Sequence, residues 1–153
     1  MRAFLLTCPL NTGCAVDSTI NQKDSDKPNE GGGNFGDRRN GGRLHAGVDL
    51  QGARGEIVVA TGDGVVSRAD ESDSGGYGKQ VKIDHGGGIE TRAGHLDEMF
   101  VKPGEPVRAG QPIGLMGRTG SVPGDTHTHQ EVIVDGRAID PANVLPGLRA
   151  RRR

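Results

Sequence analysis

The chain has 153 residues, which favours a single domain; 27 of them are glycine, 3 % are aromatic and none is tryptophan. This composition excludes an aromatic core and predicts a thin core of Val, Ile, Leu and Ala, of the kind that a bound metal often stabilises. The formal net charge is −1, but four of the 19 basic residues stand among the last five positions, so the rest of the chain is mildly acidic. An acidic body argues against a nucleic-acid-binding surface.

The N-terminal part, residues 1–34, is predicted to be an extended polar arm or linker. Its stretch 17–34 reads DSTINQKDSDKPNEGGGN, which is polar and glycine-rich as linkers are. The apolar run at 3–6 is shorter than that of an export signal, and nothing in the chain approaches the about 20 apolar residues of a membrane span. Cys8 and Cys14 are the only cysteines, and the sequence leaves open a small disulfide loop or two free thiols.

Residues 35–146 are predicted to form the globular domain, built from short strands. Runs of β-branched and apolar residues, separated by turns with Gly and Pro, occur at 56–60, 64–69, 79–85, after the glycines at 86–88, within 101–117 and at 126–136. Hairpins at such close spacing predict an all-β fold, mostly antiparallel, arranged as a twisted sheet or a sandwich.

The last of these strands carries two histidines, His127 and His129, in the stretch GDTHTHQEV. Residues two apart on a strand point to the same face, so the two imidazoles should project side by side. Burying both is costly unless their ring nitrogens find partners, which a metal or a reacting group would supply. Without further support, an H-x-H pair is more often a surface or structural feature.

Further candidate ligands stand in HAGVDL, where His45 and Asp49 are four apart and should reach one face of a strand or a helix. Imidazole and carboxylate suit zinc, and together with one or both histidines of the H-x-H pair they would make the three-ligand set of a catalytic zinc. Because the sequence has no H-E-x-x-H, the general base must come from elsewhere, and a histidine outside the metal shell could serve. His95, in TRAGHL, is expected at a strand end, and His85, in KIDHGGG, is expected in a turn.

These motifs stand in the order that one family uses. FGDRRNGGRLHAGVDL, VVATGDGVV, GYGKQVKIDHGGGIETRAGHL, VKPGEPVRAGQPIGLMGRTGS, HTHQEV and IDP resemble the lysostaphin-type (LytM-like) zinc metallopeptidases, over about residues 35–141. The resemblance implies an open groove in a mostly antiparallel β-sheet, with a zinc site on its floor, as in the duplicated hybrid motif. It also implies a zinc metalloendopeptidase that hydrolyses peptide bonds of bacterial peptidoglycan, in the stem peptide or the cross-bridge.

The resemblance assigns one Zn²⁺ per chain to His45, Asp49 and His129, and makes His95 and His127 the catalytic histidines. A zinc ion of this type activates a water for attack on the scissile carbonyl. One catalytic histidine is then expected to carry the proton to the leaving amine and the other to hydrogen-bond the developing oxyanion, and which does which stays open. Since all five positions are filled, the sequence disfavours the metal-free relatives that serve as activators.

Two residues depart from the family pattern. Ala93 stands where the family often has Tyr, Gln130 stands where Phe usually follows the H-x-H pair, and the loop before that pair is about one residue longer. We expect these changes to alter the groove walls, and thereby substrate choice and rate, more than the metal shell. Glu131 lies on the ligand face of its strand, where it is expected either to orient a ring N–H of a ligand or to be solvated.

Two other functions fit parts of the sequence. One is a non-catalytic peptidoglycan-binding or structural module of a larger assembly. The other is a carrier domain, because residues 101–114 also resemble the hairpin of biotinyl and lipoyl domains and of sugar-phosphotransferase carriers. A biotinyl or lipoyl domain is disfavoured because no acceptor lysine stands at a hairpin tip, and a phosphocarrier because it would not require Asp49 beside His45.

The expected place of action is the bacterial cell wall or periplasm. A virion-associated lysin, carried by a phage tail, is one interpretation; partner proteins would then hold the polar arm and the basic C-terminal tail at 147–153. A secreted or periplasmic enzyme is the rival interpretation. The arginines of the tail could contact an anionic partner, with a solvated chain end as the alternative.

Overall fold

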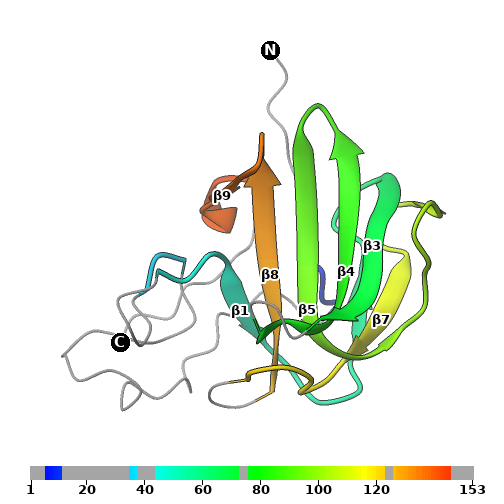
Figure 1. The fold of residues 1–153 in the computed structure, drawn as a ribbon, viewed down its shortest axis with the longest axis vertical. Coiled ribbons are helices and arrows are strands. Elements are labelled where there is room, and N and C mark those ends of the chain that lie inside the picture. The colour runs from blue at the N-terminus through cyan, green and yellow to red at the C-terminus, as the bar shows by residue number, and fades with distance from the viewer. Residues whose placement is uncertain (1–5, 12–34, 38–43, 73–75, 123–125, 146–153) are drawn as a thin grey trace.

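The computed structural model describes residues 6–11, 35–37, 44–72, 76–122 and 126–145, and these form one antiparallel β-sheet (Figure 1). Its strands are β1 (Val48–Gln51), β2 (Ile57–Val59), β3 (Gly64–Ser72), β4 (Gly78–Gly86), β5 (Ile89–Met99), β6 (Pro106–Val107), β7 (Pro112–Met116), β8 (His127–Val134) and β9 (Arg137–Ile139). One short 3-10 helix, η4 (Pro141–Asn143), follows β9. No helix of the described residues has the length and apolar character needed to cross a membrane.

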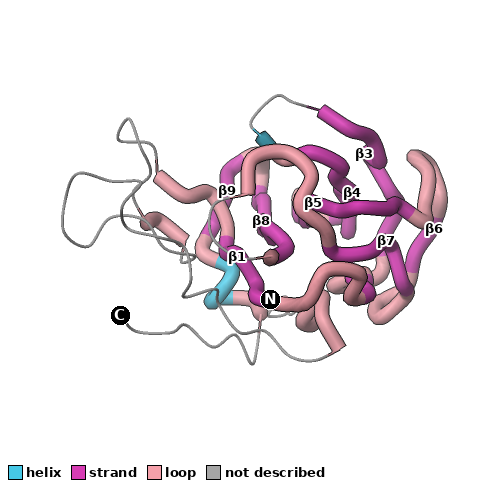
Figure 2. The backbone as a smooth tube through the Cα atoms, turned by 90° about the horizontal axis from the view of Figure 1, so that it is seen from below, coloured by secondary structure: helices cyan, strands magenta, loops and turns pink. Residues whose placement is uncertain are grey.

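The sheet runs in the order β1-β8-β5-β4-β3-β6, with β7 paired to both β5 and β2. Figure 2 shows β7 beside β5, and β1 and β9 beside β8. β1 pairs with the first half of β8 and β9 with the second half, so both share the outer edge of that strand. Every pairing between the described strands is antiparallel, which confirms the predicted all-β fold class.

The predicted runs form strands, while β1 and β9 lie outside them. The alternation along each strand sets which side chains are buried. On β4, Val81 and Ile83 are buried in the core, while Lys82 and Asp84 point to the opposite face. The core below this sheet consists mainly of aliphatic side chains, as the composition predicts, among them Leu50, Val58, Val66, Leu96, Ile113 and Met116. The opposite face of these strands carries charged side chains, among them Glu131 of β8, Arg92 of β5 and Lys82 of β4.

Residues 6–11 lie against the sheet, although they belong to the stretch predicted as a polar arm. The Leu6 N–H donates to the carbonyl of Val144 at 2.8 Å, Leu10 forms a bridge with Val58, and both leucines are buried in the core. Cys8 is disulfide-bonded. Cys14, the remainder of the arm and the basic tail lie outside the described residues, and the domain boundaries stay predictions.

Candidate metal centre

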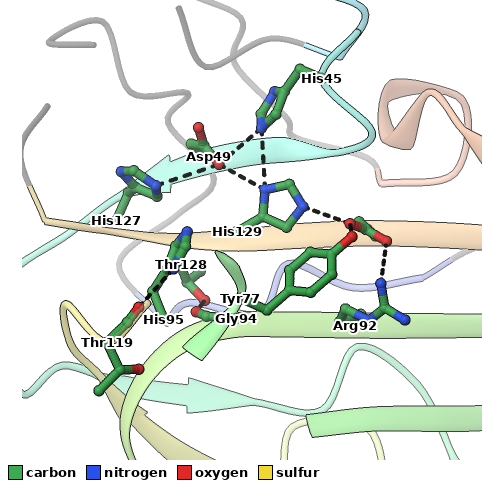
Figure 3. Close-up of polar contacts among 11 residues, drawn as sticks. His45, Asp49, Tyr77, Arg92, Gly94, His95, Thr119, His127, Thr128 and His129 are labelled. Atoms are coloured by element: carbon green, nitrogen blue, oxygen red, sulfur yellow. Dashed lines mark hydrogen bonds and ion pairs between the residues drawn. The ribbon is translucent and has the colours of Figure 1, made fainter. Parts of the chain in front are cut away.

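Three polar side chains converge where β1 meets β8 (Figure 3). Asp49 is the cross-strand partner of His129, and its Oδ1 lies 2.9 Å from Nδ1 of that histidine and 3.1 Å from Nε2 of His45. His45 Nε2 also lies 3.1 Å from His129 Nδ1, and all three side chains are buried. His45 precedes β1, so it reaches the site from the loop and not from one face of a strand. The residues expected from the sequence do come together, but His45 reaches the site from a loop and Asp49 from a strand.

The donor set of this cluster fits zinc. Two imidazole nitrogens and one carboxylate oxygen lie within 4.8 Å of one another. Zn²⁺ in catalytic sites takes three such ligands and keeps one position open. Each of the three donor atoms already points at the other two, so the chain needs little rearrangement to share one ion among them.

The electrostatics of this cluster favour a bound cation. Burial alone would raise the pKa of Asp49, but hydrogen bonds from His129 and His45 outweigh burial and hold it well below its usual range. Burial alone would lower the pKa of His129, but the hydrogen bonds and charges of Asp49 and Glu131 raise it to about 9. An imidazole between two carboxylates holds a proton when no metal is bound, and a metal cation can take the place of that proton.

His127 lies on the same strand face as His129, as predicted from their spacing. Its Nε2 is 3.5 Å from Asp49 Oδ1, and its ring is buried. The His95 ring meets it edge-on, with the two ring centroids 5.1 Å apart. The two histidines predicted to be catalytic therefore lie together, directly beside the three candidate metal ligands (Figure 3).

A bulge turns His95 toward this site. Between Lys79 and Val81, β5 holds one residue more than β4, so Gly94 and His95 face a single residue. The backbone of His95 has φ 62°, a left-handed conformation that non-glycine residues rarely adopt. In regular alternation His95 would point into the core with Ala93, whereas the bulge sends it to the site and returns Leu96 to the core. His95 is thus inside a strand, and its predicted position at a strand end was wrong.

The loop at Thr119 fixes the His95 ring. The Nδ1–H of His95 donates to the Thr119 carbonyl at 2.9 Å, which leaves Nε2 of the neutral ring as a proton acceptor. Burial, helped by the neighbouring imidazoles His127 and His129, lowers the pKa of His95 to about 4. Gly78, with φ +65°, allows the loops to touch, because a Cβ there would stand 2.3 Å from the Thr119 carbonyl carbon. The ring is therefore neutral and fixed at neutral pH.

Three residues near the site were not found from the sequence: Tyr77, Arg92 and Thr119. Each of them contacts a site residue that is distant in the sequence, so the sequence pattern alone does not show the contact. Arg92 faces Glu131 across β5 and β8, and Tyr77 donates its hydroxyl hydrogen to the same carboxylate. A glycine within a predicted strand, at position 94, was the one available sign of the bulge.

Both departures from the family pattern lie in the interior, so the expectation that they alter the groove walls was wrong. Ala93 is 3 % exposed, Gln130 is 2 % exposed, and the two are cross-strand partners on the core face. The reason is parity: a residue between two site-facing residues of a strand points the other way. Part of the longer loop, 123–125, lies outside the described residues.

The fifth histidine, His85, is inside β4 and not in a turn as expected. Its Nδ1–H donates to the Asp63 carbonyl at 2.8 Å, and its Nε2 accepts from the Thr91 hydroxyl at 2.7 Å. Thr61 in turn donates to Thr91 at 3.3 Å. These bonds give His85 a structural role and keep it apart from the metal centre.

Comparison with known proteins agrees with this geometry, since residues 43–141 match peptidase family M23. An uncharacterized metalloprotease of Haemophilus influenzae is 40 % identical over 106 residues, covering 69 % of this chain and 22 % of that protein. The DD-carboxypeptidase/endopeptidase Mpg of Neisseria meningitidis is 38 % identical over 102 residues, covering 67 % and 23 %. The murein hydrolase activator NlpD of Salmonella dublin is 35 % identical over 113 residues, covering 74 % and 28 %. The chain thus spans about a quarter of the length of these relatives.

Solved structures share the fold. A zinc-containing peptidase from Vibrio cholerae matches with a TM-score of 0.70 and 30 % identity, over 99 % of this chain and 41 % of that one. The catalytic domain of the antimicrobial peptidase lysostaphin from Staphylococcus simulans matches with a TM-score of 0.65 and 33 % identity, over 72 % and 87 %. The predicted lysostaphin-type fold is confirmed.

Proposed function

This chain belongs to peptidase family M23, and from that premise we propose that it is a zinc-dependent endopeptidase of bacterial peptidoglycan. It hydrolyses peptide bonds of the stem peptide or the cross-bridge. The observation that carries the proposal is the convergence of three metal-donor atoms within 4.8 Å, with the rings of His95 and His127 packed edge-on beside them. A binding module would need neither the donor set nor the neighbouring imidazoles.

In this proposal His45, Asp49 and His129 hold one zinc ion. Bound zinc supplies a Lewis acid that polarises the scissile carbonyl and lowers the pKa of water. His95 and His127 share the proton transfer and the stabilisation of the oxyanion. Burial keeps the His95 ring neutral and the hydrogen bond to Thr119 orients it, so that its Nε2 can accept a proton and return it to the leaving amine.

A second candidate function is activation of another hydrolase without catalysis. It is favoured by one observation, the 35 % identity to a protein named murein hydrolase activator NlpD. The filled set of five histidine and aspartate positions speaks against it, because activation through binding requires no metal and no proton carrier. Zinc content and release of amino groups from purified sacculi separate the two functions.

Delivery to the cell wall is a further part of the proposal. Either a virion, such as a phage tail, carries the chain, with its polar arm and basic tail contacting other assembly proteins, or a bacterium secretes it to the wall or periplasm. Detection of the chain in purified particles supports the first route, and its recovery from a periplasmic fraction supports the second.

The test of the function is a digest of purified sacculi followed by mass spectrometry, with and without a chelator. We expect new peptide termini at one type of peptide bond, their loss with the chelator and their return when zinc is added. The mass of the fragments identifies the bond. An undigested sacculus in the presence of a zinc-loaded chain would reject the proposal.

A further inference from the structure

The carboxylate of Glu131 is surrounded by donors. Its Oε2 accepts the Nε2–H of His129 at 2.7 Å and the hydroxyl of Tyr77 at 2.6 Å. Its Oε1 accepts a guanidinium N–H of Arg92 at 3.0 Å. The side chain is 3 % exposed, so these three bonds replace water as the partners of the buried charge.

The strand register builds this arrangement. Arg92 and Gly94 of β5 stand opposite Glu131 and His129 of β8, so all four share one face. Gly94 carries no side chain, and the Tyr77 ring lies over it, since a Cβ there would be 3.6 Å from the ring. The Arg92 guanidinium lies 4.4 Å from the centre of the same ring, and the ring centroid of Tyr77 is 5.4 Å from that of His129. The tyrosine is thus held between the cation and the imidazole (Figure 3).

These contacts decide which nitrogen of His129 faces the metal. A neutral imidazole has one N–H and one lone pair, and a carboxylate can only accept, so Glu131 requires the hydrogen on Nε2. The lone pair then stands on Nδ1, which is the atom that faces His45 and Asp49. Histidines that bind metals commonly donate their other N–H to a carboxylate in this way, and losing that partner weakens metal binding by about 10–100-fold.

We propose that Glu131, fixed by Arg92 and Tyr77, is a positioning residue that holds the His129 proton on Nε2 and presents Nδ1 to the metal. The inference rests on the proposed function in one respect, that the metal centre binds zinc. It adds that the orientation of the ligand His129 depends on Glu131 together with Arg92 of β5 and Tyr77 of the loop before β4. We call these three residues the clamp. It makes zinc affinity, and not only turnover, depend on three residues that contact no metal.

Glu131→Gln is the variant that tests the clamp, with zinc affinity measured by competition with a chromogenic chelator. A glutamine must turn its NH₂ either toward Arg92 or toward His129, and both are donors in the native arrangement. We expect zinc affinity to fall about 10–100-fold. Tyr77→Phe removes one of the donors that hold the carboxylate, and we expect a smaller loss, of a few fold.

Glu90→Gln is the matched control. Glu90 lies on the same face of β5 and pairs with Lys82 at 3.4 Å, on the side of Arg92 remote from the metal centre. We expect its zinc affinity to equal that of the wild type. Equal affinity of Glu131→Gln, Glu90→Gln and wild type would overturn the proposal.

Spectroscopy gives two readouts that do not require a measurement of zinc affinity. Tyr77 is the only tyrosine and the chain has no tryptophan, so its emission reports the contact with Glu131 directly. A phenol that donates to a carboxylate is quenched, so emission should rise in Glu131→Gln and stay unchanged in Glu90→Gln. Imidazole ¹⁵N NMR of the zinc-loaded wild type should show His129 protonated at Nε2, and protonation at Nδ1 would overturn the proposal even if Glu131→Gln did not fold.

Failure of the proposed function gives a different result. A wild-type chain that binds zinc but leaves sacculi uncut rejects the peptidase and leaves the clamp standing if Glu131→Gln weakens zinc. A wild-type chain that binds no zinc rejects the metal centre, and the clamp with it. A Glu131→Gln chain that binds zinc with wild-type affinity and still cuts sacculi rejects the clamp alone.

Discussion

One row of charges crosses the sheet, and its two ends differ in burial. Arg68 of β3 is the cross-strand neighbour of Lys82 on β4, and Lys82 is the neighbour of Arg92 on β5. Arg92 in turn stands opposite Glu131 of β8. At the β3 end, the Arg68–Asp70 ion pair is 40 % and 48 % exposed. At the β8 end, the Arg92–Glu131 ion pair is 14 % and 3 % exposed.

Similar ion pairs therefore have different effects on stability in the two regions. At the open end water competes for both charges, so the pair contributes little to stability. At the buried end each charge needs its partner, because an uncompensated buried charge is costly. The candidate metal centre lies at the buried end, where side chains have fixed partners and therefore fixed orientations.

The largest effect is expected at the buried end, from His129→Ala. The variant removes one of three donor atoms, so we expect loss of zinc and of turnover together. Elemental analysis of the purified chain and release of amino groups from sacculi measure the two. His85→Gln is the control, since that histidine lies in a separate hydrogen-bond network, and it should keep its zinc. Stoichiometric zinc in His129→Ala would remove that residue from the metal shell.

Arg92→Met tests the buried ion pair itself. The variant keeps the volume and removes one of the two cations beside Glu131, the other being His129, so we expect the free energy of unfolding to fall by up to about 3–5 kcal/mol. Denaturant unfolding measures the change. A loss below about 1 kcal/mol would show that the two ends of the row are energetically alike.

The pH dependence of the zinc-free chain comes next in size. The pKa of His129 is raised to about 9 in the folded state, from 6.5. This contribution to stability is fully present below about pH 6.5 and is lost as the pH rises through about 9. It amounts to at most about 3.5 kcal/mol, at about 1.4 kcal/mol for each unit of pKa. Thermal unfolding of the chelator-treated chain should show the melting temperature falling over this range, and His129→Gln should flatten the curve.

The smallest effect is expected at the open end, from Arg68→Met. Exposed ion pairs contribute about 0–1 kcal/mol, so we expect the free energy of unfolding, measured in denaturant, to fall by about 0.5 kcal/mol or less. Salt should reduce even this difference, because exposed charges are screened. A loss as large as that of Arg92→Met would mean that burial does not distinguish the two ends.

The strands of this fold could be predicted because their patterns are local. Val81 and Ile83 alternate with charged residues, and glycine and proline end each run, so position and facing follow from the sequence alone. The packing of residues 6–11 on the sheet could not be predicted, since it rests on leucines that meet their partners, such as Val58 and Val144, far along the chain.

The part of the site that could be predicted is the part that short sequence motifs define. His127 and His129 share a face through their spacing, and His45 with Asp49 approached them as expected. The role of Glu131 depends instead on which residue of β5 stands opposite it, and the orientation of His95 depends on a one-residue bulge. Register and bulges are properties of paired strands, so neither can be read from one strand.

The most direct test of the account is a parallel measurement on His127→Ala, of zinc content and of amino-group release from sacculi. In the proposed function the two histidines of β8 have different tasks: His129 binds the metal and His127 moves a proton or holds the oxyanion. We predict one zinc per chain, as in the wild type, and turnover reduced by about 10²–10⁴-fold. A zinc-loaded His127→Ala chain that cuts at the wild-type rate would contradict it.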